Sequence, residues 1–272
     1  MSDPLFAVEG RVAVVTGGFG QLGAELAAAL HARGMRVGVV DLAVEPRAGA
    51  ADLEPGLTDG GIRHFAADVT DRQALERVLD DITEAWGVPH ALVNAAAIDA
   101  PPDAPAEQVG PFEDVPLDAI EHVVDVNVLG TLLPCQVFGA AMARERRGSV
   151  INVASVYGLV SPDQSLYDFR RERGEVFFKP VAYAVSKSAV LNLTRYLATY
   201  WGDAGVRVNT LTPHGIADGQ SAPFVEAFAR RSPLGRLMEA REAVGAVVFL
   251  ASDASSYVTG ANIVVDGGWT AW

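Results

Sequence analysis

Cysteine is almost absent from this sequence. The 272 residues include a single cysteine, Cys135. One cysteine cannot form an intrachain disulfide or a cysteine-based metal site, and such usage suits a reducing compartment. The five histidines are scattered along the chain without the spacing of metal ligands. We therefore expect a cytoplasmic protein that has no metal site.

Positive charge is also scarce. Lys and Arg together number 21, against 34 Asp and Glu, which gives a formal net charge of −13. A chain this acidic repels phosphate backbones, so nucleic acid is not an expected partner. Lys179 and Lys187 are the two lysines, and all other basic residues are arginines.

The N-terminal residues lack the positive charge that begins a secretory signal peptide, so we expect none. One uncharged run, residues 126–143, approaches membrane-spanning length, but polar residues, a glycine and a proline interrupt it. We expect a helix that is buried against the body of the protein or a partner subunit, with no membrane contact.

Apolar material is plentiful, at 50% of the residues, and the length suits one domain, residues 1–272. Short apolar runs alternate with longer amphipathic stretches. The predicted strands are 11–16, 36–41, 61–67, 90–94, 149–154, 206–211 and 262–266. The predicted helices are 21–33, 71–86, 117–146, 181–201 and 239–251. Apolar strands separated by helices indicate an α/β fold, a doubly wound parallel sheet flanked by helices. Long connections at 99–116 and 161–180 are expected to shape a ligand site.

A glycine-rich loop joins the first predicted strand to the first helix. Gly17, Gly20 and Gly23 would let the backbone approach a pyrophosphate at the helix N-terminus. The second strand ends in Asp41, whose carboxylate can accept hydrogen bonds from ribose hydroxyls and would repel a 2′-phosphate. We therefore predict NAD as the cofactor, with NADP less favoured. The alternative is that the glycines form only a turn and Asp41 caps a strand end.

Two further strand ends point to the same cofactor. Asp68 could hydrogen-bond an adenine amine, or else cap the following helix. Asn94 and the small residues Ala95, Ala96 and Ala97 would let the chain lie close to the cofactor, or else form a tight turn.

Tyr183 and Lys187 stand four residues apart on a predicted helix and so share one face. A free tyrosine has a pKa near 10, too high for an efficient base at neutral pH. A neighbouring ammonium group favours the phenolate and lowers that pKa. We interpret the pair as an acid/base centre, and a surface Tyr–Lys pair is the alternative.

With these motifs the sequence resembles the classical branch of the short-chain dehydrogenase/reductase superfamily over nearly its whole length. The resemblance is carried by 16–23, 94–97, Asn127, Ser155, Tyr183, Lys187, 208–213 and 265–268. It implies a Rossmann-type fold, a homotetramer, and hydride transfer between nicotinamide and a secondary alcohol or ketone. The 126–143 helix, the 181–201 helix and the C-terminal strand would form the subunit contacts.

The resemblance implies a role for each matching residue. Tyr183 would exchange a proton with the substrate oxygen, and Ser155 would orient that oxygen. Lys187 would lower the tyrosine pKa and hold the nicotinamide ribose, and Asn127 would support a proton-relaying water. Alternatively, Ser155 caps a strand end and Asn127 is a satisfied core amide. Besides Tyr183 and Lys187, the implied cofactor contacts are Gly17, Phe19, Gly20, Gln21, Leu22, Gly23, Asp41, Leu42, Asp68, Val69, Asn94, Ala95, Ala96, Pro213, Gly215 and Ile216.

Three positions depart from the family pattern. Gln21 stands where the loop usually has glycine, which would alter the pyrophosphate geometry slightly. Asp218 replaces a frequent threonine and would be unfavourable near a pyrophosphate unless it points away. His214 replaces a glycine; we interpret it as a surface-loop histidine, with a position beside the substrate as the alternative.

The family usually keeps about a dozen residues between its serine and its tyrosine, whereas Ser155 and Tyr183 are 28 apart. We expect this insertion, about 159–181, to form a lid over the active site. Its arginines could bind an anion, and its aromatic residues could stack on a sugar; the alternative is a solvated helix whose aromatic residues pack inward. The candidate substrate contacts are Tyr157, Tyr167, Arg170, Arg171, Arg173 and His214.

The insertion, the 99–102 loop and the 269–272 tail resemble a sugar-dehydrogenase subgroup. We expect a polar, sugar-like alcohol or ketone as substrate, with anionic and nucleotide-activated sugars included. The alternatives are a 3-oxoacyl-thioester reductase and a catalytically silent dinucleotide-binding scaffold. The apolar tail with Trp269 and Trp272 is expected to be buried at a subunit contact.

Overall fold

The computed structural model describes residues 3–100 and 109–272 of the chain. Within these residues, seven parallel strands form one sheet in the order β3-β2-β1-β4-β5-β6-β7. The strands are β1 (Val12–Thr16), β2 (Arg36–Asp41), β3 (Ile62–Ala66), β4 (Ala91–Asn94), β5 (Gly148–Val153), β6 (Val206–Pro213) and β7 (Asn262–Val265). Chain order reverses between β1 and β4, so their carboxyl ends flank the crevice where such sheets bind ligands. The predicted doubly wound α/β fold is confirmed.

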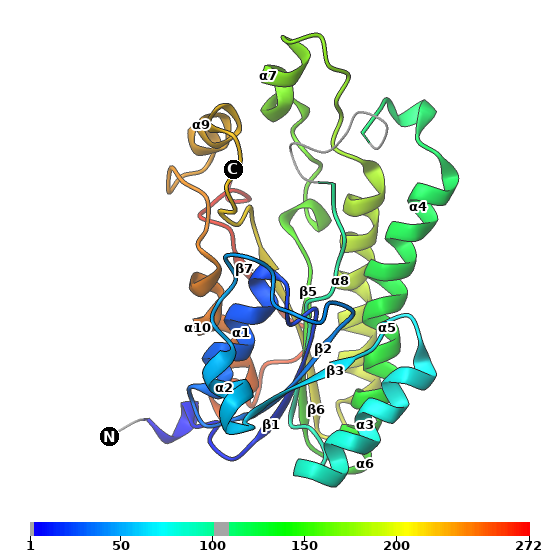
Figure 1. Ribbon diagram of the computed structural model, residues 1–272, viewed down its shortest axis with the longest axis vertical. Helices are drawn as coiled ribbons and strands as arrows, with labels where there is room; N and C mark the ends of the chain where they lie inside the picture. Colours follow the sequence, from blue (N-terminus) through cyan, green and yellow to red (C-terminus); the bar gives the residue numbers. More distant parts are fainter. Residues whose placement is uncertain (1–2, 101–108) are drawn as a thin grey trace.

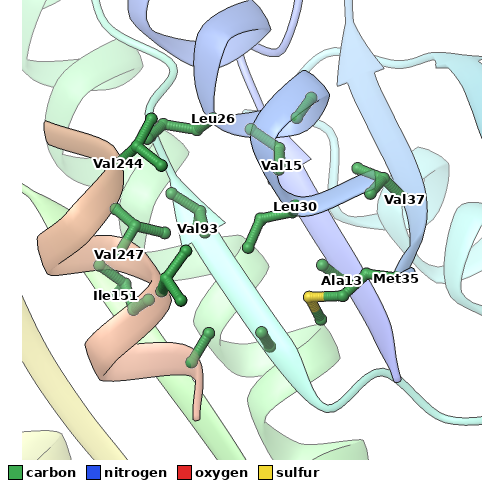
Figure 2. Close-up of a cluster of buried hydrophobic side chains, with 14 of the residues drawn as sticks. Ala13, Val15, Leu26, Leu30, Met35, Val37, Val93, Ile151, Val244 and Val247 are labelled. Carbon is green, nitrogen blue, oxygen red and sulfur yellow. The ribbon is translucent and has the colours of Figure 1, made fainter. Parts of the chain in front are cut away.

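Helices cover both faces of the sheet (Figure 1). One face is covered by α1 (Gln21–His31), α2 (Glu54–Asp59) and α10 (Val244–Ala251). Figure 2 shows this core, in which Leu26 and Leu30 of α1 and Val247 of α10 lie among strand valines. The other face is covered by α3 (Arg72–Trp86), α8 (Val181–Trp201) and the long apolar helix between β4 and β5. Burial on both sides explains why β1 is apolar at successive positions.

The long helix, Leu117–Arg144, consists of α4 (Leu117–Val124), α5 (Gly130–Pro134) and α6 (Ala140–Arg144), joined by two π-helical segments. Within the described part of the chain it is the one helix long and apolar enough to cross a membrane. Phe138 and Met142 are completely buried in the core against the sheet. The expectation of a core-packed helix is confirmed.

Several short helices were not predicted. They are α2, α7 (Asp168–Arg171) and α9 (Ala222–Arg231), and α10 begins five residues later than expected, after a 3₁₀ turn at Ala240–Ala243. Of the long 99–116 connection, residues 101–108 lie outside the described residues. The described part includes a 3₁₀ turn at Phe112–Asp114.

A third apolar cluster lies beyond the carboxyl ends of the strands. It joins the 159–181 insertion, α9 and the C-terminal tail through Tyr157, Tyr167, Phe177, Phe228 and Trp269. In Figure 1, α7 and α9 stand at this end of the sheet. The cluster fixes the walls of the candidate site.

Candidate active site

The glycine loop lies against the backbone that follows β4. Gly17 has φ +64°, and a Cβ atom there would lie 2.6 Å from the Cα of Ala96. A Cβ on Gly23 would lie 2.1 Å from the carbonyl oxygen of Gly17. Glycine is thus required at both positions by close backbone approach. The small residues after β4 are explained in the same way, because Ala95 and Ala96 pack directly on Gly17.

Asn94, at the end of β4, holds this region in place by hydrogen bonds inside the core. Its Nδ2 donates to Oδ1 of Asn152, at 2.8 Å, and to Sγ of Cys135, at 3.2 Å. The side chain therefore ties β4 to β5 and to the long helix. Burial raises the pKa of the Cys135 thiol to about 12, so this cysteine is an inert core group.

Asp41 sits beside the glycine loop at the end of β2. Its carboxylate accepts hydrogen bonds from the N–H of Phe19 and of Ala43, both at 2.9 Å. The next residue, Leu42, is 69% exposed. A carboxylate held at this edge leaves lone pairs that can accept from ribose hydroxyls.

Asp68 accepts hydrogen bonds from the N–H and the hydroxyl of Thr70. The cap of α3 is Asp71, which accepts from Ala74 N–H at 3.0 Å, so the idea that Asp68 caps this helix is wrong. Val69 is buried, and its side chain leaves no room for a Cβ at Gly130 of the long helix.

The two unusual residues Gln21 and Asp218 both line the cleft. Gln21 Nε2 donates to the carbonyl of Ala217 at 2.5 Å. The Asp218 carboxylate pairs with Arg47 at 2.6 Å. These contacts connect the glycine-loop side with the segment after β6, and Arg47 neutralises the aspartate charge that would otherwise oppose a pyrophosphate. The backbone N–H groups at the start of α1, the close Gly17–Ala96 packing and Asp41 together fit a dinucleotide.

Ser155, Tyr183 and Lys187 line one cleft of about 600 Å³. Ser155 follows β5, and the other two residues lie on the first turns of α8. Lys187 Nζ donates to the Val153 carbonyl at 2.8 Å and lies 5.8 Å from the centre of the Tyr183 ring. The structure thus brings together in one cleft three of the four side chains that the sequence predicts as catalytic, and Asn127 is not among those that line it.

Burial dominates the acid–base properties of these groups. It raises the pKa of Tyr183 above its ordinary value, and the Asp99 carboxylate raises it further, whereas the hydrogen bond with Ser155 lowers it. Burial lowers the pKa of Lys187 to about 8. Tyr183 therefore needs positive charge in the cleft before it can act as a base near neutral pH.

Asn127 lies in the first π-helical segment and is completely buried. Its Oδ1 accepts from Ile98 N–H at 2.8 Å, and its Nδ2 donates to the Ile98 carbonyl and to Ser186, each at 3.0 Å. The side chain has the contacts expected of a satisfied core amide, and it joins the long helix to α8 and to the segment after β4.

A second lysine lies beside the tyrosine. Lys179 has a side chain only 4% exposed, and its Nζ is 2.5 Å from Oδ2 of Asp99 and 2.6 Å from the Ala100 carbonyl. The same Nζ lies 5.3 Å from the centre of the Tyr183 ring. Both lysines of the chain therefore lie next to Tyr183.

His214 is not a surface residue, and that interpretation is wrong. The side chain is buried, lines the cleft, and packs on Tyr157, Phe228 and Trp269. Its Nε2 has no hydrogen-bond partner in the described structure. Burial lowers the pKa of His214 to about 3, so the ring is neutral at physiological pH.

The C-terminal tryptophans differ from each other. Trp269 is 3% exposed and stacks on Phe228 within the same chain, with ring centres 4.8 Å apart. Trp269 is therefore buried by Phe228 and His214 of its own chain, and it does not need a neighbouring subunit for burial. Trp272 is 80% exposed.

The arginines of the insertion do not line the cleft. Arg170 lies over the Phe177 ring and pairs with Glu175, and Arg171 pairs with Asp168. Arg173 lies over the Phe169 ring. Of the predicted substrate contacts, the structure places Tyr157, Tyr167 and His214 in the cleft wall and the three arginines outside it.

Sequence reasoning missed Arg47, the Lys179–Asp99 pair as a feature of the cleft, and the α9 side chains Phe224 and Phe228 that line it. A signal for α9 was available, because Phe224 and Phe228 are four apart and share a helix face. Nothing local to Arg47 or Asp99 indicates a partner that is distant in sequence.

A family model described as enoyl-(acyl carrier protein) reductase matches residues 20–270. D-threitol dehydrogenase of Mycolicibacterium smegmatis is 34% identical over 97% of this chain and 95% of its own length. A short-chain dehydrogenase from Leptospira borgpetersenii, solved with bound NAD⁺, superposes with a TM-score of 0.85 at 29% identity, covering 99% of this chain and 96% of that one. Gluconate 5-dehydrogenase from Burkholderia cenocepacia, solved with NADP and tartrate, superposes with a TM-score of 0.82 at 27% identity, covering 99% of this chain and 98% of that one. With its Ser–Tyr–Lys cleft and glycine loop, the chain belongs to the classical short-chain dehydrogenase/reductase superfamily and acts on CH–OH groups.

Proposed function

We propose that this protein is an NAD-dependent dehydrogenase of a small, uncharged polyol or sugar-like secondary alcohol. The observation that carries the substrate class is the Lys179–Asp99 pair in the wall of the cleft. An ammonium beside a carboxylate offers hydrogen-bond donors and acceptors while adding no net charge. Vicinal hydroxyl groups, each of which both donates and accepts, suit such a pair.

The remaining walls agree with this choice. The rings of Tyr157, Tyr167 and Phe228 present apolar faces, and His214 adds a neutral nitrogen without a protein partner. The insertion arginines have partners within the insertion, so an anionic or nucleotide-activated sugar is less well matched than a neutral one. The polyol named for the M. smegmatis relative supports the same class.

In the proposed mechanism, Tyr183 removes the hydroxyl proton of the alcohol, and Ser155 hydrogen-bonds the same oxygen. Lys187, held by the Val153 carbonyl, places a positive charge beside the ring and favours the phenolate. A nicotinamide dinucleotide held by the glycine loop, Asp41 and Lys187 would supply the acceptor for the hydride of the carbinol carbon. In the reverse direction Tyr183 returns the proton. Asn127 acts by positioning Ile98 and Ser186 rather than by offering a free amide.

The preference for NAD rests on Asp41. Its carboxylate stands at the end of β2 beside the glycine loop, where a 2′-phosphate would meet a negative charge. Arg47, the nearby cation along the chain, is engaged by Asp218. An Asp41→Ala variant should lose most of its preference for NAD over NADP.

The test is a panel of polyols, sugars, sugar acids and nucleotide sugars, with reduction of NAD and of NADP followed by absorbance. Turnover of NAD with neutral polyols supports the proposal, and activity confined to sugar acids or acyl thioesters contradicts it. Tyr183→Phe should abolish turnover and spare NAD binding; turnover that persists would contradict the assigned mechanism. The scaffold alternative would be favoured by two results together: the wild type turns over no compound of the panel, and a strain that carries Tyr183→Phe keeps the cellular role of the protein.

We also propose a cytoplasmic homotetramer built on the long helix and α8. Apolar side chains stand exposed on both helices, at Leu117, Leu129, Val185, Tyr196 and Tyr200. Tyr196 and Tyr200 stack with ring centres 6.0 Å apart, which leaves a flat aromatic surface. Light scattering that reports a monomer at working concentration would contradict this assembly.

A further inference from the structure

A basic cleft lies at the opposite end of the sheet from the active site. Its volume is about 840 Å³. Arg11 precedes β1, His90 precedes β4, and Arg207 lies at the start of β6, so the cleft opens at the amino ends of the strands. Arg146 and Arg147 enter it from the turn between the long helix and β5. None of these side chains belongs to the mechanism above.

The charge of this cleft opposes that of the chain. Four arginines and a histidine line it with one carboxylate, Asp253, which pairs with Arg11 at 2.7 Å. The chain as a whole carries −13. Four guanidinium groups around one carboxylate leave an excess of positive charge in a concave surface, where the potential is focused.

His90 and Arg147 are in contact in the cleft wall. Val12 N–H donates to Nδ1 of His90 at 3.2 Å. The Arg147 guanidinium contacts Nε2 of the same ring. Burial and the charges of Arg147 and Arg11 lower the pKa of His90, which keeps the ring neutral. Arg147 lines the cleft beside this neutral ring, where its guanidinium can donate to an anion.

Arg146 has an unusual backbone. Its φ of 54° makes it the one non-glycine residue with positive φ among residues 3–100 and 109–272. It follows the end of α6, where glycine is normally favoured. A side chain in this conformation costs energy, and such strain is typical of functional positions. The strain places a guanidinium at the mouth of the cleft.

We propose that this cleft binds a multiply charged phosphate anion at a second site, distant from the catalytic cleft. Arg146 and Arg147 would donate to phosphate oxygens. Tyr257, fully exposed at the cleft wall, offers a ring on which a nucleotide base could stack. Pyrophosphate and ATP share the chemistry that the arginines recognise, and Tyr257 distinguishes them.

The test is calorimetric titration of inorganic pyrophosphate, and separately of ATP, into protein saturated with its dinucleotide, so that the catalytic cleft is occupied. We expect binding that weakens roughly tenfold or more in Arg146→Ala/Arg147→Ala, since each charge-assisted contact is worth about that factor. Arg33→Ala/Arg77→Ala removes the same charge from two exposed positions outside the cleft and should bind as the wild type does. Tyr257→Ala should weaken ATP alone if a nucleotide is the ligand, and neither anion if free phosphates are.

Arg146→Gly separates binding from folding. Glycine relieves the positive φ, so the melting temperature should hold or rise, by roughly 2–4 °C per kcal/mol gained, while anion affinity falls. Anion affinity that is equal in wild type, Arg146→Gly and the double variants would overturn the proposal, as would an absence of binding to the wild type. Neither result bears on the dehydrogenase reaction, which is measured independently.

Discussion

The Lys179–Asp99 pair provides a sharp test of how charge in the cleft controls Tyr183. Asp99 raises the pKa of Tyr183, and Lys179 lies 5.3 Å from the ring centre. Replacing each member by a neutral residue of similar size should therefore move the pH dependence of alcohol oxidation in opposite directions. Asp99→Asn should shift the rising limb of kcat/KM to lower pH, and Lys179→Met should shift it to higher pH.

The size of the shift follows from Coulomb's law. At an effective dielectric constant near 20, unit charges separated by the 5.3 Å of the Lys179–ring distance interact by about 3 kcal/mol, or about two pH units. The Asp99 side chain is 35% exposed, so solvent screens part of this. We expect shifts of about one pH unit in each direction. Because Asp99 also raises the pKa of Lys187, the measured values belong to the coupled Tyr–Lys pair.

The assay is kcat/KM for oxidation across the neutral and alkaline range, with a solvent-viscosity control for diffusion. Glu175→Gln is the matched control, since it removes a carboxylate from the insertion that carries Lys179, and this carboxylate pairs with Arg170 away from the cleft. Its profile should match the wild type. Shifts of the same sign in Asp99→Asn and Lys179→Met, or shifts equal to that of the control, would refute the electrostatic reasoning.

Three further predictions concern the cofactor loop and the substrate wall. Gly17→Ala should lower the free energy of unfolding by more than about 2 kcal/mol in urea denaturation, because strain and a backbone clash add; Gly49→Ala, also at positive φ but with nothing within 4 Å, should cost only about 1 kcal/mol. His214→Phe should raise KM about tenfold at unchanged melting temperature, because it keeps the aromatic packing and removes an Nε2 that has no protein partner; an unchanged KM would exclude contact with substrate. Arg47→Ala should weaken NAD binding about tenfold by leaving Asp218 unpaired, and Arg47→Ala/Asp218→Ala should restore much of it; equal affinities in titrations of the two variants would count against the pairing.

The central strands were predictable because they are buried on both faces. In β1 each residue is buried, and the sequence shows this as an apolar run over residues 12–15, before Thr16. The helix α2 was not predictable in the same way, because its six residues include a proline and a glycine and have no apolar period. Its place is decided by packing against β3 rather than by local preference.

The candidate acid/base pair could be predicted because its spacing is local: Tyr183 and Lys187 share a helix face. The cleft wall could not, because its contacts join distant segments. His214 is buried by Phe228 from α9 and by Trp269 from the tail. The arginines of the insertion looked like an anion site in the sequence, yet Arg171 has its carboxylate three residues away and Arg170 five residues away. The positive charge of the insertion therefore suggested a bound anion, whereas in the structure Arg170 and Arg171 form ion pairs with carboxylates of the same segment.

The two lysines explain why composition was informative here. The chain uses arginine for nearly all its positive charge, and its two lysines both lie within 6 Å of the Tyr183 ring centre. Lys187 is 2% exposed, and burial lowers its pKa to about 8, a shift that an ammonium can undergo and a guanidinium cannot. Lys179 fits its compact head between the Asp99 carboxylate and the Ala100 carbonyl. A guanidinium would hold its charge at every accessible pH. The lowered pKa at position 187 therefore depends on an ammonium group, even in a chain whose other cations, apart from Lys179, are all arginine.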